Sequence, residues 1–343
     1  MSFTPAFQKV LDQITVLVEQ GTDDIEIQNF FKNSCRDLGP WERLNNLYKI
    51  RPKTPVAGER ERLAFFQPNL MQQIFWENHT TRDLVLKMRQ GGVTTFSCLI
   101  ALDKALWEEG TYSAIMADTK DHVKEYFNIT KRAFKTFKKD WGAFYKVTEN
   151  VDNVNALRIE ETNSSLLVCT DARGLSLDFL HIAEAAFIED AKISDSIEAV
   201  PLIGWVILET TADGASGLFY DLWDQSSKDK DSLYKPHFFP WWVKYPEEEQ
   251  LEIIRARVPK NISYSDKEKR LMEENNLNEL HIVWRRLKLS ESKQDEGEFN
   301  RKYPEDPMSC FLSGDSSIFP PYILVGLWKN EYIPAFIGDL IQN

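Results

Sequence analysis

The sequence predicts an α/β protein whose parallel sheet is covered by helices on both faces, and two observations support that prediction. Short apolar runs alternate with longer amphipathic stretches through the middle of the chain. Strands of a parallel sheet are buried on both faces and read as such apolar runs, and their alternation with helices is typical of a layered α/β fold. The predicted strands cover 84–88, 112–117, 166–170, 179–183 and 205–209.

Helical segments are predicted on both sides of this region. Apolar residues recur at three- and four-residue steps over 5–21 and 23–38, with Thr22 placed to cap the second helix. The stretch 51–62 has the proline, glycine and charge content of a linker, and 263–293 is highly charged with helical spacing. We therefore expect an N-terminal helical region over 1–60, a core over 61–240 and a smaller helical subdomain over 241–343.

Composition excludes several classes of protein. The net charge of −12 argues against a wholly basic surface that coats nucleic acid, although a local basic channel remains compatible with it. The four cysteines, which never form a CxxC, favour free thiols over a zinc site or a disulfide framework. The longest apolar run, near 200–208, is too short to span a membrane, and the N-terminus lacks the pattern of a secretory signal. We expect a cytoplasmic protein without membrane contact.

The segment KMRQGGVTT, from Lys87 to Thr95, resembles a phosphate-binding loop with its charges moved. The standard loop reads GxxxxGK followed by serine or threonine: its glycines turn amide donors toward phosphates, its lysine adds charge and its hydroxyl meets magnesium. Gly92 and Thr94 fall in register, but Lys87 stands where the first glycine belongs and no lysine precedes Thr94. Lys87 and Arg89 would restore the positive charge from the strand end. The alternative is a plain strand, glycine turn and helix.

A second acidic strand is the other requirement of such an ATPase, because one carboxylate orders the magnesium water shell and another polarises the attacking water. DFLHIAEAAFIED, at 178–190, ends its strand in Ala183 and Glu184. Glu184 would activate water, and the magnesium-side aspartate is missing. Magnesium tolerates a largely aqueous shell, so Thr94, phosphates and water would hold it with lower affinity. Alternatively, Ala183 abolishes hydrolysis and the nucleotide only holds an assembly together, or Ala183 is a substitution introduced to trap one state.

Taken together, these motifs resemble the terminase large subunit, the DNA-packaging ATPase of tailed bacteriophages. Its deviant phosphate loop is similar to K-x-R-Q-x-G-x-S/T-T, which the residues from Lys87 to Thr95 match. Further similar stretches follow the family's order: FQPNLMQQIF before the loop, ARGLSLDFLHIAEAAF at the acidic strand, WVILETTADGASGLFYDLW at the coupling motif and EFNRKYPEDPMSCFLSGDSSIF at the close. The resemblance covers about 65–319.

The resemblance implies a P-loop NTPase of the RecA-like (ASCE) type, with an ATPase core and a lid subdomain, that uses ATP and Mg²⁺. It implies a self-associated ring on the portal protein that drives double-stranded DNA into a procapsid in the host cytoplasm, together with a small terminase subunit. The family also carries a C-terminal nuclease domain, and because the chain stops at Asn343, where that domain would begin, no cutting activity is expected. The alternative is another P-loop DNA translocase or helicase, which would be expected to need a second RecA-like domain.

The resemblance also assigns roles to matching residues. Glu184 would activate water and Thr94 would bind magnesium. Gln72 would read adenine, with Gln67 and Gln73 as competitors, and Arg173 would act as a finger on a neighbouring subunit's ATP unless it is merely salt-bridged in its loop. The residues that would bind phosphates are Lys87, Arg89, Gln90, Gly91, Gly92, Val93, Thr94 and Thr95. The residues that would couple hydrolysis to movement are Thr210, Thr211 and Ala212. The alternative is that this second group only caps the end of a strand.

Two basic clusters are candidates for contact with DNA phosphates. The segment 121–139 places Val123, Phe127, Thr130, Phe134 and Phe137 on one helical face, with Lys131, Lys135, Lys138 and Lys139 away from its centre. The second cluster comprises Arg285, Arg286 and Lys288. Either one is also compatible with an ordinary solvated helix face.

Overall fold

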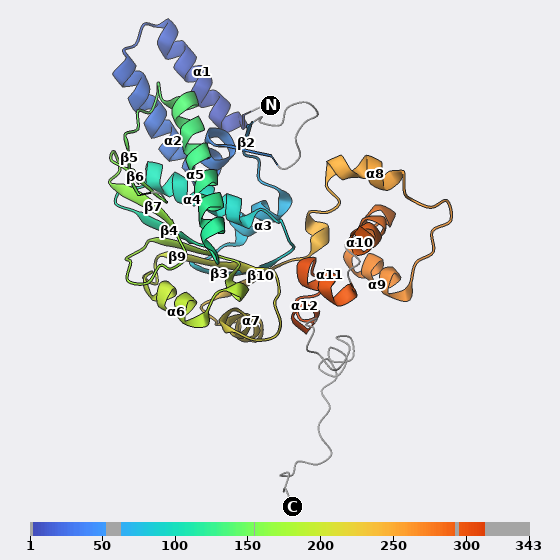
Figure 1. Cartoon of the computed structure of the whole chain (residues 1–343). Helices are drawn as coiled ribbons and strands as arrows, with labels where there is room; N and C mark the ends of the chain where they lie inside the picture. Colours follow the sequence, from blue (N-terminus) through green and yellow to red (C-terminus); the bar gives the residue numbers. More distant parts are fainter. Residues whose placement is uncertain (1–2, 53–62, 154, 292–294, 313–343) are drawn as a thin grey trace, which may run out of the picture.

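A mostly parallel sheet forms the centre of the computed structural model, which describes residues 3–52, 63–153, 155–291 and 295–312 (Figure 1). Its eight strands lie in the order β10-β3-β9-β8-β4-β7-β6-β5. The strands from β10 to β7 pair in parallel, and β6 and β5 are added antiparallel. The bounds are β3 (Arg82–Lys87), β4 (Tyr112–Met116), β5 (Glu149–Asn153), β6 (Ala156–Ile159), β7 (Ser164–Cys169), β8 (Phe179–Ala183), β9 (Trp205–Thr210) and β10 (Lys235–Phe239). This confirms the predicted α/β, RecA-like fold class.

Helices cover both faces of the sheet, which explains why its central strands are buried and rich in apolar residues. All residues of β3 and β8 are buried, and successive side chains enter different cores. Val85 and Ile207 join the core that contains α4 (Val93–Trp107) and α5 (Lys120–Trp141). Leu84 and Leu208 join the opposite core, built with α6 (Asp190–Glu198) and α7 (Leu218–Lys228) (Figure 1).

The N-terminal helices α1 (Pro5–Glu19) and α2 (Asp24–Leu47) pack on the α5 side of the core (Figure 1). Phe7 and Phe31 contact Trp141 of α5, with ring centroids 5.4 and 5.8 Å away.

The expected Thr22 cap was wrong: Asp23 caps α2, because its carboxylate accepts hydrogen bonds from two backbone amides of the first turn. A short pair, β1 (Lys49–Ile50) and β2 (Ala64–Phe65), follows. The expected domain boundary at residue 60 lies outside the described residues.

A helical subdomain, which we call the lid, follows β10. It contains the short turns η2 (Trp241–Val243) and η3 (Glu248–Gln250) and the helices α8 (Leu251–Arg255), α9 (Asp266–Asn275), α10 (Glu279–Glu291) and α11 (Glu296–Lys302). The predicted helix over 263–293 is therefore two helices, since Asn276 adopts a left-handed φ of 53° and ends α9. Trp284 stacks on Trp241 at 4.9 Å, forming the lid's aromatic centre. The chain then returns through α12 (Ser309–Leu312), where Phe311 contacts Tyr220 of α7 at 5.0 Å.

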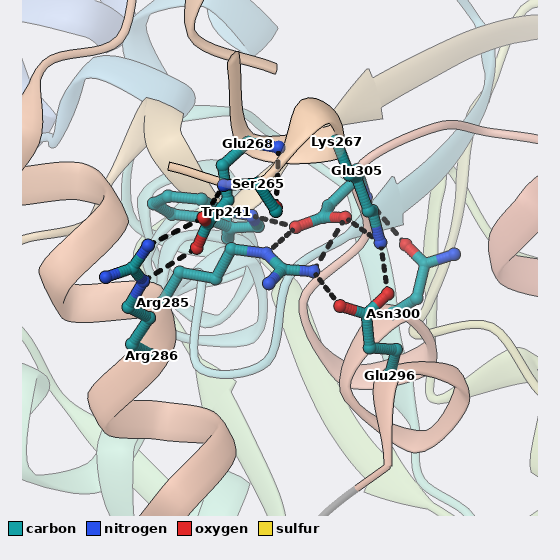
Figure 2. A network of polar contacts seen from close by, with 9 residues as sticks. All are labelled: Trp241, Ser265, Lys267, Glu268, Arg285, Arg286, Glu296, Asn300 and Glu305. Atoms are coloured by element: carbon teal, nitrogen blue, oxygen red, sulfur yellow. Dashed lines mark hydrogen bonds and ion pairs between the residues drawn. The ribbon is translucent and has the colours of Figure 1, made fainter. Parts of the chain in front are cut away.

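The basic cluster predicted on α10 is a set of internal ion pairs (Figure 2). Arg285 is buried and binds Glu305 at 2.6 Å and Glu296 at 3.1 Å. Arg286 binds Glu268 at 2.7 Å, and Lys288 binds Glu291 at 2.6 Å. Carboxylates of the lid therefore pair with this cluster, and contact with DNA stays a prediction for the partly exposed Arg286 and Lys288.

Two further expectations concern the cysteines and membranes. Cys35, Cys98, Cys169 and Cys310 are free thiols, as predicted. Among the helices of the described ranges, none combines the length and apolar character needed to cross a membrane.

Candidate active site

The loop from Met88 to Gly92 connects the buried strand β3 to the N-terminus of α4. Gln90 and Gly92 adopt left-handed φ values of 62° and 90°, which curl the chain between the two elements. Gly92 is the N-cap of α4, so the free amides of the first helical turn face outward at this point. A helix N-terminus of this kind favours bound anions. The geometry fits the predicted phosphate loop.

Neighbouring side chains fix the shape of this loop. Asn69 and Gln72 form a capping box at the start of α3 (Leu70–Asn78). Their amide groups then donate to the loop, from Asn69 Nδ2 to the Gly91 carbonyl at 3.0 Å and from Gln72 Nε2 to the Gly92 carbonyl at 2.8 Å. Gln72 is buried and both ends of its side-chain amide are bonded. The structure thus gives Gln72 contacts with Asn69 and with the loop backbone, and its role toward adenine stays a prediction.

Gly92 is the position where a side chain is least compatible with the loop. An alanine there would hold a left-handed φ, which costs about 1–2 kcal/mol, and its Cβ would lie 3.0 Å from Gln72 Nε2. We expect Gly92→Ala to lower stability by this amount and to weaken nucleotide binding in a fluorescence titration. Gly110→Ala is the matched control, because Gly110 has a φ of +67° and open space around it. Equal nucleotide affinities in the two variants would contradict a role for the loop's shape.

Lys87 is the cation at the centre of the site. It is the last residue of β3, almost fully buried, and its Nζ lies 2.9 Å from Glu184 Oε1 and 3.3 Å from Glu209 Oε2. Burial lowers the Lys87 pKa, but the two carboxylates more than offset this, so the pKa is raised and the amine is charged. The sequence predicted that a cation at the end of the strand replaces the usual lysine of the loop. The charged Lys87 ammonium group is compatible with that prediction.

Glu209 was missed by the sequence analysis. It is fully buried near the end of β9, and its Oε1 accepts a hydrogen bond of 2.6 Å from Thr94 Oγ1. The signal available in the sequence was a lone carboxylate inside the apolar run WVILET. His181 on β8 lies 3.6 Å away through Nε2. Burial, aided by Lys87, lowers the pKa of His181 to about 3, so this imidazole is neutral.

Glu184 directly follows β8 and keeps part of its side chain exposed. Its φ of 54° and ψ of 47° are left-handed, which is unusual for a residue other than glycine, asparagine or aspartate. Such backbone strain persists only where the surroundings impose it and is concentrated at functional sites. The carboxylate faces the same cavity as the phosphate loop.

One cavity of about 640 Å³ collects most of these groups. The predicted residues that line it are Lys87, Arg89, Gln90, Gly91, Gly92, Val93, Thr94, Thr95, Glu184, Thr211 and Ala212. The residues that sequence reasoning did not anticipate include Asp118, His122, Tyr126, Asp213, Arg301 and Lys302. Gln72, Thr210 and Arg173 are not among its lining residues.

Thr210 lies behind the cavity and links two of its walls. Its hydroxyl donates to the Thr211 carbonyl at 2.7 Å and accepts from the Ala186 amide at 3.3 Å. Ala186 belongs to the short turn η1 (Ala185–Phe187), which follows Glu184. The end of β9 is thus bonded to the segment that carries the candidate catalytic carboxylate.

Arg173 lies apart from this cavity, in the exposed loop after β7. Its guanidinium binds Asp171 at 2.6 Å, and it lies 3.7 Å from Asp195. The hydrogen bond from Arg173 lowers the pKa of Asp171. The role of Arg173 as a finger toward a neighbouring subunit stays a prediction.

Residues of the lid and of α5 complete the cavity wall. The Arg89 amide donates to the Lys302 carbonyl at 2.7 Å, and Lys244 Nζ donates to the Gln90 carbonyl at 2.8 Å, so the lid is bonded to the phosphate loop. On the α5 side, a hydrogen bond with Asp118 raises the pKa of His122. These groups add charge that sequence spacing alone did not place near the loop.

Several solved structures of known proteins align with this chain. The large terminase of bacteriophage HK97 aligns at 14% identity with a TM-score of 0.52, covering 77% of this chain and 53% of that chain. The large terminase ATPase domain of Thermus phage P74-26 aligns at 17% identity with a TM-score of 0.48, covering 70% of this chain and 94% of that chain. A terminase of another thermophilic bacteriophage, in complex with ATP-γ-S, aligns at 10% identity with a TM-score of 0.38, covering 55% and 48%.

Sequence comparison adds no relative. No protein-family model matches the chain, and none of the curated proteins matches it. The similarity to large terminases therefore rests on the arrangement of strands and helices. The deviant phosphate loop and the acidic strand had suggested the same family from the sequence. Over the aligned part, the chain shares the fold of the large terminase of bacteriophage HK97.

Proposed function

We propose that this protein is the ATP-hydrolysing motor of a terminase large subunit and that it moves double-stranded DNA into a procapsid. One observation carries the proposal: the phosphate loop, Glu184 and the segment after β9 line a single cavity. A motor needs these three parts together, because the group that activates water must be joined to an element that responds when the γ-phosphate leaves.

The proposed reaction is an in-line attack of water on the γ-phosphorus of ATP. Glu184 accepts a hydrogen bond from the water and polarises it. The water oxygen bonds to phosphorus and gives one proton to the Glu184 carboxylate. The bond to the bridging oxygen of the β-phosphate breaks, and ADP leaves with that electron pair. Lys87 and Arg89 line the cavity on the phosphate-loop side and compensate charge on the phosphates. Since Lys87 binds Glu184 at 2.9 Å, phosphates would compete for its ammonium group and release the carboxylate to act on water.

The charges of the site fit a requirement for Mg²⁺. Lys87 also faces two carboxylates, Glu184 and Glu209, so Lys87 and Arg89 compensate only part of the charge of a polyphosphate. No cluster of three or more His, Cys, Asp or Glu side chains in the described residues is placed to hold a metal alone. The ion would therefore depend on the phosphates, on water and on the Thr94 hydroxyl, which suits magnesium. When bound, it supplies positive charge to the phosphate oxygens.

Coupling to movement is proposed through the end of β9. Thr211 and Ala212 line the cavity, and Thr210 bonds the segment after Glu184. Loss of the γ-phosphate would alter the contacts of Thr211 and be passed to α7, which begins shortly afterward at Leu218. Arg173 would complete a neighbour's site in the ring on the portal protein, after release from Asp171.

A hollow on α5 is the proposed contact with DNA. Lys131, Arg132, Lys135 and Lys139, together with Arg51, line a cavity of about 730 Å³ on the outer side of this helix. The apolar face of α5, including Phe127, Phe134 and Phe137, is buried as the sequence predicted. Contacts of lysine and arginine with the phosphate backbone are independent of base sequence, which suits a translocating motor.

The test is magnesium-dependent ATP hydrolysis by the whole chain at high protein concentration, with and without double-stranded DNA. We expect turnover that Glu184→Gln lowers at least about 100-fold, the usual contribution of a general base. Nucleotide binding by Glu184→Gln should survive, because the loop is intact. Turnover by Glu184→Gln equal to that of the unmodified chain would refute the assignment. Nucleotide binding without turnover, with or without DNA, would favour the second candidate, a nucleotide-binding packaging subunit that Ala183 has disabled.

A further inference from the structure

The position of the missing aspartate and the buried carboxylate of Glu209 lie side by side in the sheet. β9 runs between β3 and β8, and Ala183 of β8 pairs in register with Glu209 of β9. Both residues are fully buried. Ala183 and Ile207, which lies two residues before Glu209 on β9, enter the same core, on the side of α4. Side chains two residues apart on a strand share a face, so Glu209 projects beside the Ala183 methyl group.

The carboxylate of Glu209 reaches the group that a magnesium-side acid has to reach. Its Oε1 accepts from Thr94 Oγ1 at 2.6 Å, and Thr94 is the hydroxyl of the phosphate loop proposed to meet the ion. Because β9 adjoins β3, this carboxylate starts one strand nearer to the loop than residue 183 does. Ala183 carries only a methyl group and leaves this space to the longer side chain.

Among the described residues, the ion pair with Lys87 leaves one carboxylate oxygen of Glu209 without a hydrogen bond. Lys87 already has Glu184 at 2.9 Å, and a buried carboxylate is costly unless its oxygens are satisfied. Within the described residues, Glu209 Oε2 accepts no hydrogen bond, although Lys87 Nζ lies 3.3 Å away. This oxygen retains capacity for a water molecule of a hydrated cation.

We propose that Glu209 replaces the missing aspartate from the adjacent strand, orienting Thr94 and ordering the water shell of Mg²⁺ at the nucleotide. The inference rests on the proposed ATPase function and deepens it. It also changes the expectation for Ala183: the alanine does not disable the site, because the acid has moved across one strand. Ala183→Asp alone would place a second carboxylate beside Glu209, and like charges at one buried site disfavour ionisation.

The experiment measures the Mg²⁺ affinity of the protein–nucleotide complex, not turnover. A fluorescent ATP analogue is held at saturation while Mg²⁺ is titrated, and binding without Mg²⁺ is measured in EDTA. Glu209→Gln should lower the apparent Mg²⁺ affinity about 10-fold or more, the range seen for groups that orient metal ligands, and leave EDTA binding intact. Ala183→Asp/Glu209→Gln, which returns the acid to the other strand, should regain most of that affinity.

Two variants keep the outcome decisive. Glu209→Asp retains the charge beside Lys87 but is too short for Thr94, so it should fold and still lose Mg²⁺ affinity, even if Glu209→Gln is unstable. Glu184→Gln should lose turnover and keep its Mg²⁺ affinity. The inference is overturned if Glu209→Asp keeps its Mg²⁺ affinity, or if a folded double variant does not recover it. In either case, hydrolysis by the unmodified chain would still support the proposed function. Failure of the unmodified chain to bind nucleotide overturns the proposed function itself.

Discussion

Lys87→Met is expected to abolish ATP hydrolysis and to lower the free energy of unfolding by about 3–5 kcal/mol, the usual cost of breaking a buried ion pair from one side. The lysine is almost fully buried between Glu184 and Glu209. Methionine fills similar volume but leaves the carboxylate of Glu209 in the core without a cation. Chemical denaturation measures the stability change, and a phosphate-release assay measures the loss of turnover.

Two comparisons separate charge from packing in this prediction. Lys104→Met removes a lysine whose partner, Glu108, is more exposed and one helical turn away, so it should cost less than about 1 kcal/mol. Lys87→Met/Glu209→Gln removes the unpaired charge and should regain much of the lost stability without regaining turnover. If the double variant is as unstable as Lys87→Met, the loss arises from packing of the lysine stem instead of the unpaired charge.

The central fold was predictable from sequence because burial on both faces leaves an unambiguous pattern. Strands such as β3 and β8 are buried along their whole length and are centred on apolar residues, and the predicted bounds agree within about two residues. The edge strand β10, with the sequence KPHFF, is only partly buried and mixes polar with apolar residues. β5 and β6 are antiparallel additions at the other edge. Edge strands lack the two-sided burial that makes the central ones readable.

The parts of the candidate site that are contiguous in sequence could be predicted. The parts that tertiary contacts bring together could not. The phosphate loop and Glu184 could be found because each adjoins a recognisable strand. Glu209 could not, because its role depends on which strand lies between β3 and β8, and strand order is a property of the sheet. The contact of Gln72 with the loop was not predictable for the same reason: only the packing of α3 against the loop shows that its amide is bonded to Gly92.

The basic clusters show how charge alone misleads. Those on α5 and α10 look alike in sequence, yet Arg285 is buried and paired with Glu305, which lies twenty residues further along the chain. Lys131 and Lys135 line an open hollow instead. Spacing along one helix reports which residues share a face. It does not report whether acidic residues of another segment cover that face.

Arg43→Leu should detach much of the N-terminal region from the core and cost about 3–5 kcal/mol. Arg43 on α2 binds Asp103 on α4, at 3.0 Å through Nε and 2.8 Å through Nη2. Tyr48 donates to the same carboxylate at 2.7 Å and accepts from Trp107 at 3.1 Å. The substitution leaves Asp103 buried and uncompensated at the interface of α2 and α4. Thermal unfolding and protease sensitivity of the N-terminal helices measure the effect.

The pH dependence of this variant identifies the cause of its instability. Burial raises the pKa of Asp103, and Arg43 opposes that rise, so removal of the arginine should raise this pKa further. A carboxyl whose folded pKa exceeds its unfolded pKa contributes stability at low pH that is lost as pH rises through these values. The deficit of Arg43→Leu relative to the unmodified chain should therefore shrink between pH 7 and pH 5, and Arg43→Leu/Asp103→Asn should show little such change. Lys124→Ala, which breaks the exposed pair with Asp121, should cost less than about 1 kcal/mol at either pH. A deficit in Arg43→Leu that is the same at both pH values would mean that the lost hydrogen bond to the Cys35 carbonyl and lost packing, not the unpaired carboxylate, hold α2 on the core.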